Sequence, residues 1–228
     1  STLSFKVVGT LKCSAAANPN SMAVDRSGTA WVNYSDGSLF KVSTANASCT
    51  PTAFVPGQHG FGRFGMAFAS NSPGSIDETL FVCGLPTVGF DGHGLAKIDI
   101  ATLALTPIGD FTNGLTNESA ELTGTGDGRL YGFFPSNPAS LAEIDKTTAA
   151  TPTNKSLTNV YSGTDWAMSF WGGDFWFYTA DSKTLQFATT SVTQLKTATD
   201  SLAVVKNNVG FRVVGAGVST CAPLAPPK

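Results

Sequence analysis

The chain has 228 residues, a net charge of −2 and a charged fraction of 13%, which is about half the usual share. Its Lys and Arg residues are scattered singly, which argues against nucleic acid or an anionic membrane as a partner. No apolar run approaches the roughly 18 residues that span a bilayer. Four Glu against 24 Gly disfavour helices, whereas plentiful Val, Thr and aromatic residues favour strands.

A short segment recurs four times along the chain. Large apolar residues occupy its first column: Met22, Met66, Leu122 and Met168. Smaller residues follow directly: Ala23, Ala67, Thr123 and Ser169. This alternation has a period of two and predicts a strand with one crowded face and one tight face.

Three further strands are predicted in each repeat, after a turn rich in Gly, Ser or Asp. The second strands cover residues 29–34, 79–84, 129–134 and 174–179, with aromatic anchors at Trp31, Phe81, Tyr131 and Trp176. The third strands cover 38–44, 94–100, 140–146 and 184–190. Weaker fourth strands are expected near 50–55, 105–111, 152–160 and 193–200.

The repeats predict an all-β protein with the architecture of a small β-propeller. Four strands per repeat of about 44 to 56 residues are typical of a propeller blade. From Leu39, Leu95 and Leu141 to the next first-strand anchor the spacing is always 27 residues, which an ordinary sandwich of short strands does not explain. We expect one domain over residues 1–228, with repeats at about 18–60, 61–116, 117–163 and 164–210.

The two ends of the chain resemble each other. Residues 5–9 read Phe-Lys-Val-Val-Gly and residues 211–215 read Phe-Arg-Val-Val-Gly. We expect terminal strands at 4–12 and 211–220 to pair and close a ring of four blades, or to form a reduced fifth blade, because closure removes exposed edges. No signal peptide is present, and the chain is interpreted as the mature or trimmed form of an extracytoplasmic protein that is secreted, periplasmic or on the outer surface.

The four cysteines are widely spaced, without a CxxC pair, so a zinc site is not expected. At least one disulfide is expected in an exported chain, and three complete pairings are open. In a regular blade Cys13 and Cys49 would lie on opposite faces, too far apart to bond. They bracket the first blade and would pair only if the N-terminal strand departs from that geometry. Cys83 is interpreted as a free, packed thiol, and Cys221 is left unassigned.

One face of the ring is expected to carry the ligand site. The loops that enter each first strand and those that join the second and third strands surround the mouth of the axial channel there. The ligand-binding candidates on this face are Tyr34, Asp36, Arg63, Phe90, Asp91, Glu118, Asp165 and Trp166.

Three residues are weak catalytic candidates. Glu121 has small column partners, so its carboxylate would project into an axial cavity, where confinement could raise its pKa. The alternative is a Glu bonded to backbone amides or channel water. His59 and His93 lie in Gly-rich loops and could form a general base or metal site with Asp91 or Glu121, or they are simply solvated.

Three stretches carry a resemblance to known proteins: residues 19–32, 120–130 and 213–223. The first reads Pro-Asn-Ser-Met-Ala-Val-Asp-Arg-Ser-Gly-Thr-Ala-Trp-Val and looks like propeller proteins generally. Together the three resemble uncharacterised exported propeller proteins of myxobacteria, over nearly the whole chain. The resemblance implies the fold, a bacterial source and export, and it brings no catalytic residue.

The sequence therefore leaves three hypotheses. The first is a non-catalytic extracytoplasmic binding module, a monomer without cofactor or metal, that recognises a glycan or protein at the channel-mouth face. The second is a hydrolase or lyase that uses the axial Glu121 with a loop histidine. The third is a structural envelope or interaction domain.

Overall fold

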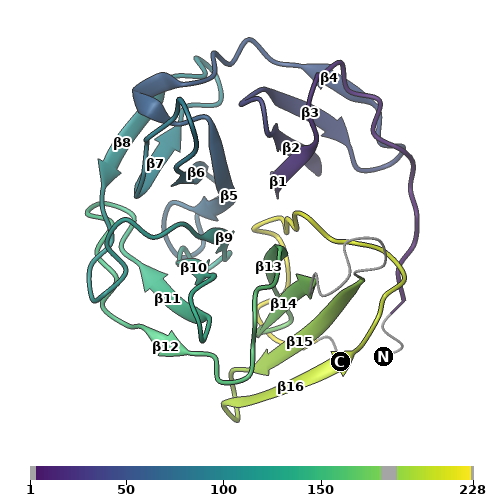
Figure 1. Ribbon diagram of the computed structural model, residues 1–228, viewed down its shortest axis with the longest axis vertical. Coiled ribbons are helices and arrows are strands. Elements are labelled where there is room, and N and C mark those ends of the chain that lie inside the picture. The colour runs from purple at the N-terminus through teal and green to yellow at the C-terminus, as the bar shows by residue number, and fades with distance from the viewer. Residues whose placement is uncertain (1–3, 181–188, 227–228) are drawn as a thin grey trace.

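The alternating columns fold into four antiparallel sheets around one axis. The structure is a computed structural model that describes residues 4–180 and 189–226. In it the four sheets form the blades of a ring (Figure 1), each ordered from the innermost strand outward, as the repeat predicted. The chain is thus an all-β protein with the architecture of a four-bladed β-propeller.

Blades one and two occupy the first half of the chain. Blade one consists of β1 (Pro19–Val24), β2 (Thr29–Tyr34), β3 (Leu39–Ser43) and β4 (Cys49–Pro51). Blade two consists of β5 (Arg63–Ser70), β6 (Glu78–Leu85), β7 (Leu95–Ile98) and β8 (Leu105–Gly109). A single 3₁₀ turn, η1 (Gln58–Gly60), precedes β5.

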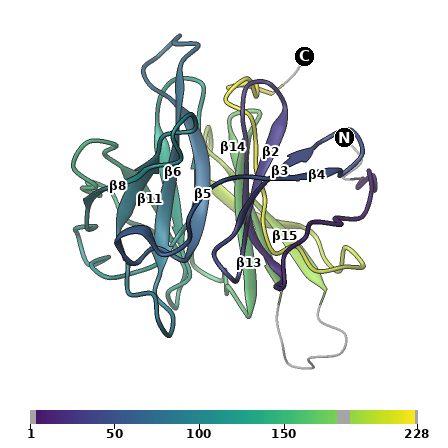
Figure 2. The ribbon, with the colours of Figure 1, turned by 90° about the horizontal axis from the view of Figure 1, so that it is seen from above.

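Blades three and four follow with the same order. Blade three consists of β9 (Glu121–Gly124), β10 (Leu130–Phe134), β11 (Ser140–Ile144) and β12 (Lys155–Ser156). Blade four consists of β13 (Asp165–Trp171), β14 (Asp174–Ala180), β15 (Thr190–Lys196) and β16 (Ser201–Lys206). Seen from the side, β5 and β13 run along the ring axis while β4 is steeply inclined to it (Figure 2), as expected from the twist of each sheet.

The aromatic anchors occupy equivalent positions in all four blades. Each anchor pairs directly with the small residue of the innermost strand: Ala23 with Trp31, Ala67 with Phe81, Thr123 with Tyr131 and Ser169 with Trp176. The first three anchors are buried, whereas Trp176 is only half-buried. The small partner leaves space for the aromatic side chain on the face that the neighbouring blade covers. The same strand register recurs in every blade because every blade has this packing.

The hydrophobic core is divided into layers between blades. One cluster joins blades one and two through Trp31 and Phe68, a second joins blades two and three, and a third joins blades three and four. A fourth cluster covers the remaining face of blade one, around Val32 and Phe40, and its cover comes from residues 13–17 rather than from blade four.

We expected a pair of terminal strands to close the ring, and this prediction is wrong. Neither residues 4–12 nor residues 211–220 form a strand. Instead the segment 211–226, which we call the C-terminal tail, passes between β1 and β13 (Figure 1) and approaches the backbone of β1 at Gly215 and Gly217. Farther along, the Gly172 amide donates to the Pro223 carbonyl at 2.8 Å. The tail therefore fills the gap between blades one and four.

The two outer strands of blade four lie later in the chain than the sequence predicted. The expected third strand at 184–190 falls mostly outside the described residues, and the expected fourth strand at 193–200 covers the end of β15 and the turn after it. That turn contains neither Gly nor Pro, and its one typical turn residue is Asp200, whose φ is 51°. The Asp174 carboxylate also stabilises the turn, because it accepts from the Thr197 amide at 3.1 Å.

The disulfide joins Cys13 and Cys49, with their Cα atoms 5.1 Å apart. These residues meet because the N-terminal segment is not a strand of a regular blade, which removes the geometric objection to this pair. Cys83 is free and buried, as interpreted from the sequence, and Cys221 is free and exposed.

Candidate functional site

A cavity of about 610 Å³ opens at one end of the ring axis, where the innermost strands begin. One row of equivalent positions contributes a residue from every blade to its lining: Pro19, Arg63, Ser119 and Asp165. These four side chains differ in charge and shape, so the mouth is chemically asymmetric although the fold is nearly symmetric. We call this space the channel-mouth cavity. Its remaining lining residues are Asn18, Asn20, Ser35, Gly65, Leu85, Ala120, Glu121, Thr164, Trp166, Arg212 and Val214.

Glu121 lies at the centre of this arrangement. Its side chain is 6% exposed, and its Oε2 accepts a 2.8 Å hydrogen bond from the Ser21 hydroxyl of the opposite blade. Gly65 lets the backbone of blade three approach this closely, since a Cβ there would lie 2.0 Å from the Ala120 carbonyl oxygen. Burial raises the pKa of Glu121 well above its usual value, although the bonds from Ser21 and the Met66 amide act in the opposite direction.

Arg63 is held by neutral groups. Its Nε and Nη2 donate to the Asn20 Oδ1 at 3.1 and 2.8 Å. Asn20 is fixed in turn, because its amide nitrogen donates to the Phe64 carbonyl at 3.1 Å and to the Asn33 Oδ1 at 3.3 Å. Arg63 forms no ion pair with any residue of the described ranges 4–180 and 189–226.

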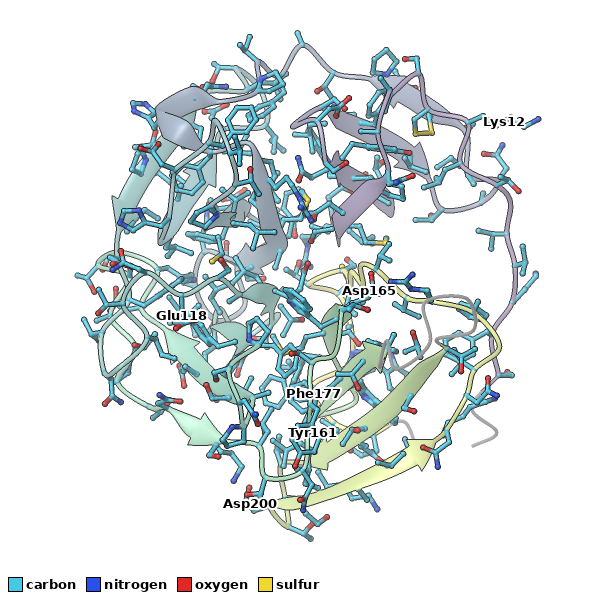
Figure 3. All side chains as sticks on the ribbon, viewed as in Figure 1. Lys12, Glu118, Tyr161, Asp165, Phe177 and Asp200 are labelled. Carbon is cyan, nitrogen blue, oxygen red and sulfur yellow. A yellow bond between two sulfur atoms is a disulfide. The ribbon has the colours of Figure 1, made fainter. Side chains whose placement is uncertain are left out.

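Asp165 is a second acidic residue of the cavity lining, and Arg212 of the C-terminal tail pairs with it through Nη2. The Thr164 hydroxyl donates to the same Asp165 oxygen at 2.9 Å. Figure 3 shows Asp165 closer to the centre of the ring than Glu118. The tail thus both closes the ring and brings a cation to the channel mouth.

Four of the residues suggested by the sequence line the cavity: Arg63, Glu121, Asp165 and Trp166. The other suggested ligand-binding residues are not in its lining. Tyr34 is buried against Phe40 with ring centroids 5.2 Å apart, and the ring of Phe90 packs over Gly57 and Gly62.

The acidic members of that group lie in exposed loops. Asp36 accepts from the Ser38 amide at 3.0 Å within its own turn. Asp91 lies against Gly60, and Glu118 is exposed before β9.

The histidines are not brought to Glu121. His59 lies in η1 with a left-handed backbone angle of φ 50°, and neither histidine lines the cavity. The His93 Nε2 lies 3.9 Å from the Asp110 Oδ2, and its Nδ1 is 3.2 Å from the Asp91 carbonyl oxygen. Within the described ranges no three His, Cys, Asp or Glu side chains gather as a metal site would require.

Asn20, Thr164 and Arg212 are cavity residues with charge-assisted contacts that sequence reasoning missed. Asn20 directly precedes the repeated segment and so lies at the mouth, a signal that the repeat already contained. Arg212 belongs to a segment that we expected to be a closing strand, so its side chain had no predicted place.

In the part of the chain described here, no helix has the length and apolarity to cross a membrane.

Comparisons with known proteins identify the fold. No family model matches the chain, and no curated protein does. Among solved structures, an exo-β-1,3-galactanase from Phanerochaete chrysosporium, with bound β-1,3-galactotriose, matches with a TM-score of 0.57 at 7% identity, covering 89% of this chain and 53% of that chain.

Two further structures match across most of this chain. YjhT matches with a TM-score of 0.55 at 13% identity, covering 86% of this chain and 67% of that one. The extracellular domain of BT4673 from B. thetaiotaomicron matches with a TM-score of 0.50 at 14% identity, covering 85% and 25%. This chain therefore spans a quarter of one neighbour and about half of the galactanase, and identities this low show a shared fold alone.

Proposed function

We propose that the protein is a non-catalytic, extracytoplasmic binding module that holds a glycan in the channel-mouth cavity. One observation carries the proposal: a cavity of about 610 Å³, within the range of small-ligand sites, receives polar side chains from all four blades or their entering loops and contains Trp166. Hydroxyl and amide groups match the many donors and acceptors of a sugar, and an indole offers an apolar face to its ring.

A concave site of this size favours a glycan over a protein ligand. Protein partners usually bury about 800 Å² of surface on each side, which a small cavity cannot supply alone. The galactotriose bound to the exo-β-1,3-galactanase that shares this fold supports a carbohydrate as the ligand class.

An extracytoplasmic location rests on three supports. A disulfide is typical of oxidising compartments, and Cys13 and Cys49 form one. One structural neighbour is an extracellular domain. The sequence resemblance to exported propeller proteins of myxobacteria points in the same direction.

The test is a glycan array followed by titration of the best binder. Replacing Trp166 with Ala should weaken that binding at least tenfold, because it removes the one indole that the described residues contribute to the cavity lining. Trp171→Ala is the matched control, since Trp171 lies at the other end of β13 and is 43% exposed. Equal loss in both variants, or no binder on the array, would overturn the proposal, and the latter would favour a structural domain.

A glycoside hydrolase is the second candidate, and the environment of Glu121 favours it. A general acid needs a raised pKa, which burial confers on Glu121. Asp165 provides a second carboxylate in the same cavity, as glycosidases require, although Arg212 pairs with it.

Incubating the array's best binder with the protein separates the two candidates. A binding module leaves the oligosaccharide intact. A hydrolase releases reducing ends, and Glu121→Gln, which keeps an acceptor for Ser21, would abolish that release while the folded state persists.

A further inference from the structure

Among the described residues, four charged or ionisable side chains line the channel-mouth cavity: Arg63, Glu121, Asp165 and Arg212. Asp165 and Arg212 compensate each other as an ion pair. Glu121 is buried and bonded to a neutral hydroxyl, so it keeps its proton to a higher pH than an ordinary carboxyl group. Arg63 remains as a cation without a carboxylate partner among the described residues.

The guanidinium of Arg63 is already positioned for a ligand. Two of its N–H groups are used on the Asn20 Oδ1, and Asn20 is itself anchored to the backbone at Phe64. The remaining N–H groups donate to no other residue in the described part of the chain, and Arg63 lies in the cavity lining. A fixed guanidinium fork matches a carboxylate better than any neutral group, because it can donate two parallel hydrogen bonds.

The energetics of filling the cavity also favour an anion. A ligand that enters displaces water from Arg63, and a charge that loses its hydration without a partner costs free energy. A neutral sugar offers Arg63 only hydroxyl acceptors, whereas an acidic sugar replaces the lost hydration with stronger, charge-assisted hydrogen bonds inside a site of lower dielectric constant.

We propose that the ligand of the channel-mouth cavity is an acidic glycan, one of whose sugar carboxylates binds the guanidinium of Arg63. The inference rests on the proposed glycan-binding function and goes further by naming the ligand's charge. It also assigns Arg63 as the residue that distinguishes acidic from neutral sugars.

The experiment compares uronate-containing oligosaccharides with the same oligosaccharides after reduction of their carboxyl groups to neutral hydroxymethyl groups. On the native protein we expect the acidic member of a pair to bind at least tenfold more tightly, and to weaken as salt is added. Sulfated oligosaccharides form a third arm. Tighter binding of these than of the uronates would overturn the carboxylate assignment.

Two variants test whether the preference for acidic oligosaccharides depends on the Arg63 side chain. Arg63→Gln should abolish the preference, so that the acidic and neutral members of a pair bind about equally. Arg63→Lys should keep part of the preference, because the positive charge remains although the planar guanidinium is lost. Arg129→Gln is the matched control, because Arg129 is 48% exposed and pairs with Asp127 in the β9–β10 turn.

The outcomes separate this inference from the proposed function. Equal or tighter binding of the neutral members to the native protein would overturn the inference and leave glycan binding standing. Failure of every oligosaccharide to bind would overturn both. The comparison of matched ligands needs no variant, so it stands even if Arg63→Gln does not fold.

Discussion

The seam between blades two and three and the seam between blades four and one solve the same packing problem differently. In the first, the backbones of β5 and β9 meet so closely that a Cβ at Gly65 or Gly124 would lie 2.0 Å from a carbonyl oxygen. In the second, the C-terminal tail lies between the blades, and a mainly apolar cavity of about 420 Å³ remains beside it. We call these the tight seam and the open seam.

The difference shows what a four-bladed ring requires. Each blade must cover one face of its neighbour, and three seams do so with buried aromatic anchors. At the open seam the equivalent anchor, Trp176, is half-buried, and the residues that cover blade one come from the two chain ends. Closure by this irregular segment also brings Arg212 to the channel mouth, whereas Arg63, Glu121 and Asp165 come from the blades.

The same substitution in both seams should give the largest contrast. Gly65→Ala should lower the free energy of unfolding by about 3 kcal/mol or more, because the tight seam cannot accommodate a methyl group. Gly215→Ala should cost about 1 kcal/mol, since its Cβ would lie 3.1 Å from the Ser21 Cα and the tail can shift. Urea unfolding of the two variants measures both values. Equal losses would show that the seams do not differ in tightness.

The next effect concerns the anchor of the tail at the far end of the open seam. The buried Thr220 hydroxyl donates to the Glu78 Oε2 at 2.7 Å and accepts from the Arg26 Nη1 at 3.1 Å. Thr220→Val should cost about 1–2 kcal/mol, because it leaves these groups without that partner. Thr106→Val, at an exposed position of β8, is the control.

Hydrogen exchange locates this loss. In Thr220→Val the amides of residues 211–226 should exchange faster, while those of β5 and β9 keep their protection. Equally faster exchange in both places would mean that the tail is not a separate closing element.

Glu121 links blade three of the tight seam to blade one of the open seam, and its ionisation should make stability depend on pH. Because burial raises its pKa, the folded protein keeps this proton to a higher pH than the unfolded chain, whose Glu titrates near 4.5. Stability contributed by the protonated form is complete below 4.5 and is lost as pH rises through the folded-state pKa.

Glu121→Gln removes that loss, so the variant should gain stability relative to the native protein as pH rises above 4.5. Urea unfolding of both proteins at a series of pH values measures the difference. Parallel stability profiles would contradict the raised pKa.

The smallest effect distinguishes the seams by their free thiols. Cys83 lies in the tight seam, where its sulfur accepts from the Ala120 amide at 3.1 Å and burial raises its pKa to about 12. Cys221 is exposed on the tail. A thiol reagent such as DTNB should therefore modify Cys221 rapidly in the native protein and Cys83 only after unfolding. Rapid modification of both thiols would show that the tight seam opens readily.

The repeated part of the architecture was predictable, because alternation and matched columns report a packing that every blade shares. The positions of β1 and β2 follow from Met22, Ala23 and Trp31 because each of these residues has a counterpart in the other three repeats. The strands β15 and β16 were misplaced because the turn between them has neither Gly nor Pro, and its one typical turn residue, Asp200, was taken as the end of the expected fourth strand. The closure was missed for a related reason: residues 211–215 resemble a strand locally, and only the space between blades one and four decides their course.

The candidate site divides in the same way. Arg63, Asp165 and Trp166 were predicted because residues at the start of an innermost strand must lie near the channel mouth. Tyr34 was misplaced because its position in the blade did not reveal that Phe40 covers it. The role of Arg212 depends on the path of the tail, which local sequence does not encode.

A crystal structure with the tightest acidic oligosaccharide from the matched pairs tests the central claim most directly. We expect the sugar in the channel-mouth cavity, with a carboxylate accepting two hydrogen bonds from Arg63 and the sugar ring against Trp166. A sugar bound in the apolar cavity of the open seam, or on the outer surface with Arg63 still bonded only to Asn20, would contradict it.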